Sequence, residues 1–134
     1  MSGDVRVVLV DDERLILDLL HAAFEDGGYA VEIAAGCEDA LAALAVDATG
    51  RQALVTDINI AGDPLTGWDL AHKAREIDPQ IPIVYMTGAA GAEWSANGVP
   101  NSILLIKPFA PAQAVTAVSQ LLNSQPGPSN NSSI

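Results

Sequence analysis

Short apolar runs alternate with segments of helical period along most of this chain, and this alternation limits its fold more than any other feature. Five runs rich in Val, Ile and Leu have the character of strands buried on both faces, at residues 5–10, 30–35, 53–56, 81–86 and 102–106. Segments with helical character follow them, at residues 16–24, 38–46, 70–77, 90–97 and from Pro111 onward. Because alternating strands and helices form parallel sheets through right-handed crossovers, the order predicts an α/β fold with a doubly wound parallel sheet.

The end of the chain differs in composition from the rest. From residue 124 onward the sequence is rich in Ser, Asn and Pro, which supply little apolar surface for a core. The length of 134 residues, of which 49% are hydrophobic, suits a single domain. We therefore expect one domain over residues 1–123, followed by a flexible polar tail at residues 124–134.

The chain is acidic, with 6 Lys and Arg against 17 Asp and Glu and a formal net charge of −11. This charge repels nucleic-acid phosphates and anionic lipid headgroups, so we expect neither nucleic acid nor a membrane as a partner. The single cysteine, Cys37, cannot form a disulfide within the chain. Because there is no basic leader and no uninterrupted apolar stretch of about 18 residues, we expect a cytoplasmic protein.

Polar side chains follow four of the five predicted strands. The first strand ends in Asp11-Asp12-Glu13, the third in Asp57, the fourth in Thr87 and the fifth in Lys107. The carboxyl ends of parallel strands lie at one edge of the sheet, which is where open α/β sheets bind their ligands. We therefore expect these side chains to form one site.

The residue types at this edge indicate magnesium and phosphate chemistry. Converging carboxylates repel one another unless a cation lies between them, and oxygen ligands without His or Cys suit Mg²⁺. Asp12 and Asp57 are the first candidates as ligands. Lys107 supplies a positive charge and Thr87 a hydroxyl donor for a bound phosphoryl group. The pattern thus predicts phosphoryl transfer to Asp57 as the nucleophile.

Each of these residues also has a plainer interpretation. Asp11 and Asp12 could cap the helix that follows them, since Asp is a favoured N-cap residue. Thr87 could be a β-branched strand residue bonded to the backbone, and Lys107 an ordinary turn residue before a proline. Their occurrence together at one sheet edge favours the site.

The same residues resemble the receiver domain of response regulators in bacterial two-component signalling. The resemblance covers residues 5–122 and is carried by Asp11-Asp12, Asp57 with Ile58-Asn59, Gly67, Thr87-Gly88 and Lys107-Pro108-Phe109. It implies a flavodoxin-like (βα)5 fold with strand order 2-1-3-4-5, which brings Asp12 and Asp57 together.

The resemblance also implies a function for each site residue. Asp57 would accept a phosphoryl group from a histidine kinase or a histidine phosphotransfer protein, while Thr87 and Lys107 bind the phosphoryl oxygens. Mg²⁺ would be held by Asp12, Asp57 and the backbone carbonyl of Asn59, with Asp11 reaching it through water.

We therefore expect a stand-alone signalling switch without an output domain. It is not an enzyme in the usual sense, because it would catalyse only its own phosphorylation and dephosphorylation. By the resemblance, it would bind a downstream protein through its fourth helix, fifth strand and fifth helix, and homodimerisation stays open.

Two features depart from the usual pattern of the family. The position three before the lysine, where an aromatic residue often takes part in switching, is Leu104. The loop at residues 60–67 is longer than usual and has no proline directly after Ile60. We interpret Asp63 on this loop, and Asp69 after it, as solvated surface residues because neither ends a strand.

Two alternative functions remain at this point. The first is a receiver fold used as a phosphorylation-independent scaffold, which would have no reason to keep the complete site. The second is a phosphatase of the haloacid-dehalogenase type, which also uses an Asp nucleophile and Mg²⁺. In that family, however, the nucleophile ends the first strand and a second acid stands two residues later, where this chain has Asn59.

Overall fold

The computed structural model of the chain describes residues 5–46, 51–88 and 97–124. Five strands form one parallel sheet in the order β2-β1-β3-β4-β5. The strands are β1 (Arg6–Val10), β2 (Ala30–Ala34), β3 (Gln52–Asp57), β4 (Ile83–Thr87) and β5 (Ser102–Ile106). The described helices are α1 (Arg14–Asp26), α2 (Cys37–Val46), α3 (Gly67–Ile77) and α5 (Pro111–Asn123).

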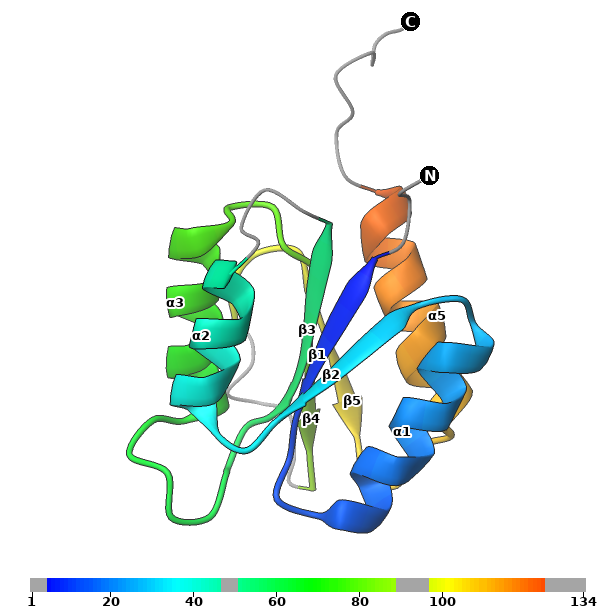
Figure 1. Cartoon of the computed structure of the whole chain (residues 1–134), viewed down its shortest axis with the longest axis horizontal. Coiled ribbons are helices and arrows are strands. Elements are labelled where there is room, and N and C mark those ends of the chain that lie inside the picture. The colour runs from blue at the N-terminus through cyan, green and yellow to red at the C-terminus, as the bar shows by residue number, and fades with distance from the viewer. Residues whose placement is uncertain (1–4, 47–50, 89–96, 125–134) are drawn as a thin grey trace, which may run out of the picture.

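This architecture confirms the predicted fold class and strand order. Figure 1 shows α1 and α5 on one face of the sheet and α2 and α3 on the other. The helix predicted at residues 90–97 lies outside the described residues except for Asn97, and the tail predicted at 124–134 does so except for Ser124. None of the helices in the described ranges has the length and apolar character needed to cross a lipid bilayer.

Alternate residues of the central strands point into two separate apolar layers. One layer lies between the sheet and helices α2 and α3, and includes Val8, Leu54, Tyr85, Leu44 and Leu70. The other lies between the sheet and helices α1 and α5, and includes Val7, Val55, Met86, Phe24 and Val118. The two layers bury the central strands on both faces.

The prediction that all five strands are buried on both faces is wrong for β2 and β5. In β2, Ala30 and Glu32 are exposed, and in β5 the side chain of Ile106 is exposed by 53%. The order 2-1-3-4-5 puts these two strands at the sheet edges, where the helices cover them incompletely. The central strands β3 and β4 are buried at every position.

The register of the sheet aligns the carboxyl ends of its strands. Val10 of β1 pairs with Thr56 of β3, and Asp57 of β3 pairs with Met86 of β4. Thr87 of β4 in turn pairs with Ile106 of β5. Residues that directly follow or end these strands therefore meet at one edge.

Candidate functional site

Three carboxylates meet at the carboxyl edge of the sheet. Asp11 and Asp12 follow β1, and Asp57 is the last residue of β3. Each offers an oxygen atom, and these three atoms all lie within 4.8 Å of one another. Asp11 and Asp57 are buried, whereas Asp12 is exposed. The sequence thus predicted correctly which acidic residues the fold brings together.

Lys107, which directly follows β5, is the positive charge of this group. Its Nζ donates hydrogen bonds to Asp11 Oδ2 at 3.0 Å, to Glu13 Oε1 at 3.1 Å and to Asp57 Oδ2 at 3.2 Å. Burial acts to lower the pKa of Lys107, but the hydrogen bonds to Asp11 and Glu13 and the charge of Asp57 outweigh it and raise the pKa. The lysine therefore keeps its charge at neutral pH.

Asp11 lies beneath the lysine with a side chain that is 0% exposed. Burial raises the pKa of the Asp11 carboxyl, and the negative charge of Asp57 adds to this effect. The amide N–H of Glu13, which donates to Asp11 Oδ1 at 2.9 Å, and Lys107 oppose it. The environment of Asp11 therefore disfavours its charged form, and the hydrogen bonds from the Glu13 amide and Lys107 offset that effect in part.

The donor set fits a hard divalent cation. The site combines three carboxylates, those of Asp11, Asp12 and Asp57, with the one positive charge of Lys107. Every ligand atom that the carboxylates offer is an oxygen. Oxygen-only sets with one or two carboxylates and water are typical of Mg²⁺. A cation would offset the repulsion that the single lysine leaves unbalanced.

Asp12 also contacts the loop that follows β3. The amide N–H of Ala61 donates to Asp12 Oδ2 at 3.2 Å. Neither Asp11 nor Asp12 is the N-cap residue of α1, because Glu13 occupies that position and its side chain makes no capping bond. Asp11 does accept from the Glu13 amide at the start of the helix. The two aspartates face the sheet edge and the loop.

Gly67, the first residue of α3, lies directly against the end of β3. Its amide N–H donates to the Ile58 carbonyl at 2.7 Å. A Cβ atom at this position would lie 2.3 Å from the backbone oxygen of Asp57, closer than any real contact allows. The helix can start here only because the residue is glycine.

Thr87 and Lys107 are tied together by the backbone. The amide N–H of Lys107 donates to the Thr87 carbonyl at 2.7 Å, which continues the pairing of β4 with β5 beyond its last register pair. Thr87, the last residue of β4, is buried at the carboxyl edge of the sheet. Asn59 is exposed, two residues beyond Asp57.

Leu104, which stands where the family often has an aromatic residue, is half-buried against the α2 and α3 layer. Its partner in the register is Tyr85 of β4. The Tyr85 hydroxyl accepts a hydrogen bond from the Val99 amide at 3.1 Å, and its ring lies 4.7 Å from that of Trp68. At this register position the aromatic residue is thus on β4 and not on β5.

Two residues have contacts that the sequence did not indicate. Asp63, interpreted as solvated surface, accepts hydrogen bonds from the backbone amides of Cys37 and Leu65. Its position two residues before Leu65 in an Asp-Pro turn is the signal that could have revealed the second bond. Glu13 forms the third contact of Lys107, for which the sequence gives no specific signal.

Asp69, the other acid interpreted as surface, is exposed but forms a capping box with Thr66 at the start of α3. The Asp69 amide donates to the Thr66 hydroxyl oxygen, and the Asp69 carboxylate accepts from the Thr66 amide at 3.1 Å. The spacing of Thr and Asp three residues apart is the signal that could have revealed it.

A parallel sheet of this order, with an acidic group facing a lysine at its carboxyl edge, is the arrangement of a receiver domain. The chain belongs to the response regulator receiver domain family, whose model matches residues 7–119.

Solved structures agree with this assignment. A response regulator receiver protein from Sinorhizobium medicae WSM419 has a TM-score of 0.82 and 43% identity, covering 92% of this chain and 98% of that one. The receiver domain of NtrX from Brucella abortus has a TM-score of 0.76 and 26% identity, covering 89% and 99% of the two chains.

Curated relatives are longer proteins. The transcriptional regulatory protein TrcR of Mycobacterium tuberculosis is 28% identical over 123 residues, which are 90% of this chain and 46% of TrcR. The nitrogen assimilation regulatory protein NtrX of Azorhizobium caulinodans is 29% identical over 105 residues, 77% of this chain and 23% of NtrX. The chain thus spans less than half the length of these two relatives.

Proposed function

We propose that this receiver domain is a phosphorylation-controlled switch in which Asp57 is the phosphoacceptor. The observation that carries the proposal is the group of three carboxylate oxygens within 4.8 Å of one another, with Lys107 bonded to two of the three acids. Asp57 belongs to this group and, although the residue is buried, 11% of its side chain remains exposed. It therefore combines a charged environment with access from solvent.

The transfer that we propose is a displacement at phosphorus. One carboxylate oxygen of Asp57 forms the new bond to phosphorus while the bond from phosphorus to the imidazole nitrogen of a phosphohistidine breaks. The imidazole leaves with the electron pair of that bond. A histidine kinase or a histidine phosphotransfer protein would supply the phosphohistidine. Because little covalent work falls to the protein, positioning and charge neutralisation carry the rate.

The residues proposed to hold Mg²⁺ are Asp12, Asp57 and the backbone carbonyl of Asn59, with Asp11 acting through water. When bound, the ion would neutralise charge on the transferring oxygens. Asp11 serves a second purpose, because its buried carboxylate holds the Lys107 ammonium beside Asp57. Asp11 thus keeps the lysine in position for the incoming group.

Thr87 and Lys107 would bind the phosphoryl group. Lys107 would exchange its bond to Asp57 for one to a phosphoryl oxygen, and the Thr87 hydroxyl would bind a second oxygen. The added negative charge shifts the balance between two conformations through these local bonds. With Leu104 on β5, an aromatic contribution to this shift would come from another element. Among the residues that the structure describes, Tyr85 of β4, the register partner of Leu104, is the candidate.

Partner binding is proposed to follow from this shift. The output surface would consist of the segment at residues 90–97, β5 and α5, and a downstream protein or a second copy of the chain would bind there. The exposed Ile106 side chain on β5 supports this placement. Signalling without an output domain, a polar tail at residues 124–134 and a cytoplasmic location stay predictions.

Membership of the receiver family argues against the haloacid-dehalogenase type of phosphatase. We propose instead that catalysis is limited to the domain's own phosphorylation and dephosphorylation. The complete set of Asp12, Asp57, Thr87 and Lys107 argues against a scaffold that does not depend on phosphorylation.

The test is intact-mass analysis after incubation with acetyl phosphate, with and without Mg²⁺. We expect the wild type to gain one phosphoryl group only when Mg²⁺ is present, and Asp57→Asn to gain none while remaining folded. Asp18→Asn removes an exposed carboxylate of α1 outside the site and should behave as the wild type. Uptake by Asp57→Asn at an unchanged rate would show that the assignment of Asp57 is wrong. If no adduct forms at all, formation of a beryllofluoride complex distinguishes a short-lived acyl phosphate from a scaffold.

A further inference from the structure

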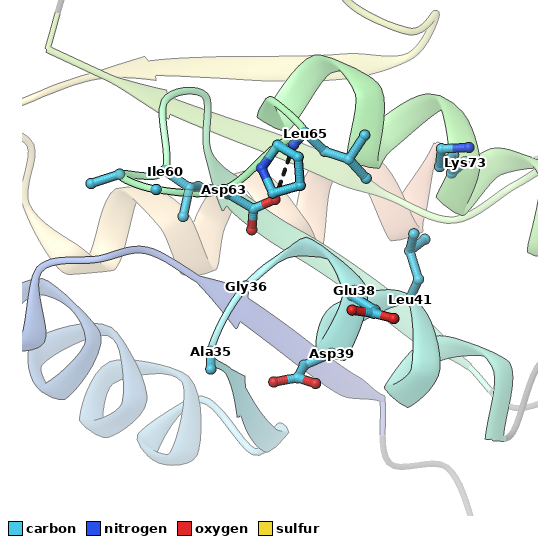
Figure 2. A pocket seen from close by; sticks show the side chains of 12 residues that line it. Ala35, Gly36, Glu38, Asp39, Leu41, Ile60, Asp63, Leu65 and Lys73 are labelled. Atoms are coloured by element: carbon cyan, nitrogen blue, oxygen red, sulfur yellow. Dashed lines mark hydrogen bonds between the residues drawn. The ribbon is translucent and has the colours of Figure 1, made fainter.

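The carboxylate of Asp63 joins two segments that are far apart in the sequence. Asp63 Oδ2 accepts a hydrogen bond from the amide of Cys37, the first residue of α2, at 2.8 Å. Asp63 Oδ1 accepts a second from the amide of Leu65 at 3.0 Å, which Figure 2 shows as a dashed line. One side chain therefore fixes the loop after β3 to the start of α2.

Further contacts pack the loop after β3 closely against the start of α2. A Cβ atom at Gly36 would lie 2.7 Å from Asp63 Oδ2, so the carboxylate is in contact with the turn between β2 and α2. The Cys37 thiol donates to the carbonyl oxygens of Leu65 at 3.7 Å and Thr66 at 3.9 Å. The hydrogen bonds from Cys37 and Leu65 lower the pKa of Asp63, so it is ionised at neutral pH at the positive end of α2.

The other end of the same loop lies at the candidate site. The amide of Ala61 donates to Asp12 Oδ2, and the amide of Asp63 donates to the Ile60 carbonyl at 3.1 Å. A turn through Gly62, whose φ of +78° favours glycine, connects Ala61 to Asp63. The position of the Ala61 amide therefore depends on where Asp63 is held.

We propose that Asp63 is a positioning residue for the magnesium and phosphoryl site, acting through Ala61 on Asp12. By anchoring the loop to α2, Asp63 keeps the Ala61 amide against Asp12 and so keeps the Asp12 carboxylate within reach of Asp11 and Asp57. This inference rests on the proposed function. Outer hydrogen bonds of this kind orient a ligand before the ion arrives, and without the anchor the loop must be ordered during binding, which weakens affinity.

The test compares Asp63→Ala with Asp39→Ala. Asp39 lines the same pocket and lies in the first turn of α2, so its removal changes the charge in the same way. Unlike that of Asp63, its side chain makes no hydrogen bond to the described residues. We expect Asp63→Ala to raise the dissociation constant for Mg²⁺, measured by calorimetric titration, roughly tenfold, the lower end of the effect of losing an outer-shell partner. Asp39→Ala should keep the wild-type value.

Two further readouts separate positioning from general destabilisation. The rate of phosphorylation by acetyl phosphate should be low for Asp63→Ala at limiting Mg²⁺ and return to the wild-type rate at saturating Mg²⁺. Hydrogen exchange at the Ala61 amide, measured without metal, should be faster in Asp63→Ala and unchanged in Asp39→Ala. If Asp63→Ala does not fold, Asp63→Asn, which keeps one acceptor oxygen, should give smaller changes in the same direction.

The outcomes distinguish this inference from the proposed function. If the wild type binds Mg²⁺ and takes up the phosphoryl group while the Asp63 variants keep the wild-type dissociation constant, only the inference is overturned. A rate lowered equally at all Mg²⁺ concentrations would likewise show a merely structural role. If the wild type neither binds Mg²⁺ nor forms an adduct, the proposed function fails and this inference fails with it.

Discussion

The first atom of any side chain at Gly67 would lie 2.3 Å from the backbone oxygen of Asp57 and 2.8 Å from the Cα of Ile58. The start of α3 and the end of β3 therefore touch through their backbones. Both neighbouring atoms belong to the main chain, so neither can rotate away. This contact sets the distance between the helix and the proposed phosphoacceptor.

We expect Gly67→Ala to lower the free energy of unfolding by about 2 kcal/mol or more, since a tightly packed region must move to admit the methyl group. The displaced Asp57 should also take up phosphate more slowly. Urea unfolding and intact-mass kinetics measure the two effects. Gly88→Ala is the matched control, because no atom of the residues that the structure describes would lie within 4 Å of a Cβ there. An equal loss of stability in both variants would contradict the argument from contact.

Mg²⁺ should stabilise the wild type, because an ion that binds only the folded state adds its binding free energy to folding. At ten times the dissociation constant the gain is about 1.4 kcal/mol, and excess EDTA should remove it. Asp12→Asn should lose most of this gain, whereas Asp18→Asn, which changes an exposed carboxylate on α1, should keep it. Thermal unfolding with and without Mg²⁺ measures the difference. The same gain in Asp12→Asn would exclude Asp12 as a ligand.

Lys107→Ala should destabilise the fold at pH 7 by roughly 3 kcal/mol, because it leaves the buried Asp11 carboxylate without its cation. Removing the lysine raises the pKa of Asp11 further, so the acid can be relieved by protonation. The stability difference from the wild type should therefore shrink as the pH falls below 7.

Denaturant unfolding of both proteins across this pH range measures that difference. Lys73→Ala, which removes an exposed lysine of α3, should cost little at any pH. A difference for Lys107→Ala that does not change with pH would show that Asp11 is not the group left unpaired.

The ionisation of Cys37 makes the free energy of unfolding depend on pH at alkaline pH. Burial, together with the charge of Asp63, raises the pKa of the Cys37 thiol from 9.0 to about 12. Above pH 9 the unfolded chain therefore releases a proton that the native protein keeps. The contribution is fully present below pH 9 and is lost as the pH rises towards 12, by about 1.4 kcal/mol per pH unit.

The measurement is the stability difference between the wild type and Cys37→Ala at pH 8 and pH 10. We expect the stability of the wild type, relative to that of Cys37→Ala, to fall over that interval. Alkylation of the native thiol at pH 8 should also be slow, because the side chain is buried and protonated. Rapid alkylation under native conditions would contradict the raised pKa.

Sequence reasoning found the main features of this fold because they depend on local period and on one topological rule. The Val-rich run that became β1 and the stripe from Ile16 to Phe24 in α1 are each readable within a few residues. Parallel strands then force their carboxyl ends to one edge. Asp11, Asp57 and Lys107 could therefore be grouped although they lie on different strands.

The features that sequence reasoning missed depend on contacts between segments. Asp63 bonds to Cys37, 26 residues away, and nothing near Asp63 in the sequence specifies that partner. The exposure of Glu32 and Ile106 follows from the sheet edge, which a run of apolar residues does not reveal. Glu13 meets Lys107 only because α1 starts beside the end of β5.

The hydrogen bond between Asp11 and Lys107 joins positions 96 residues apart. During synthesis, the acidic residues that follow β1 and end β3 leave the ribosome before the lysine that neutralises them. A nascent chain that stops before Ser102 would contain every carboxylate and lack the cation. Because β5 is the last of the five strands to be synthesised, its neighbour Lys107 is the last of these site residues to become available. If Lys107 is needed for phosphate uptake as proposed, phosphorylation would be confined to molecules in which all five strands have formed the sheet.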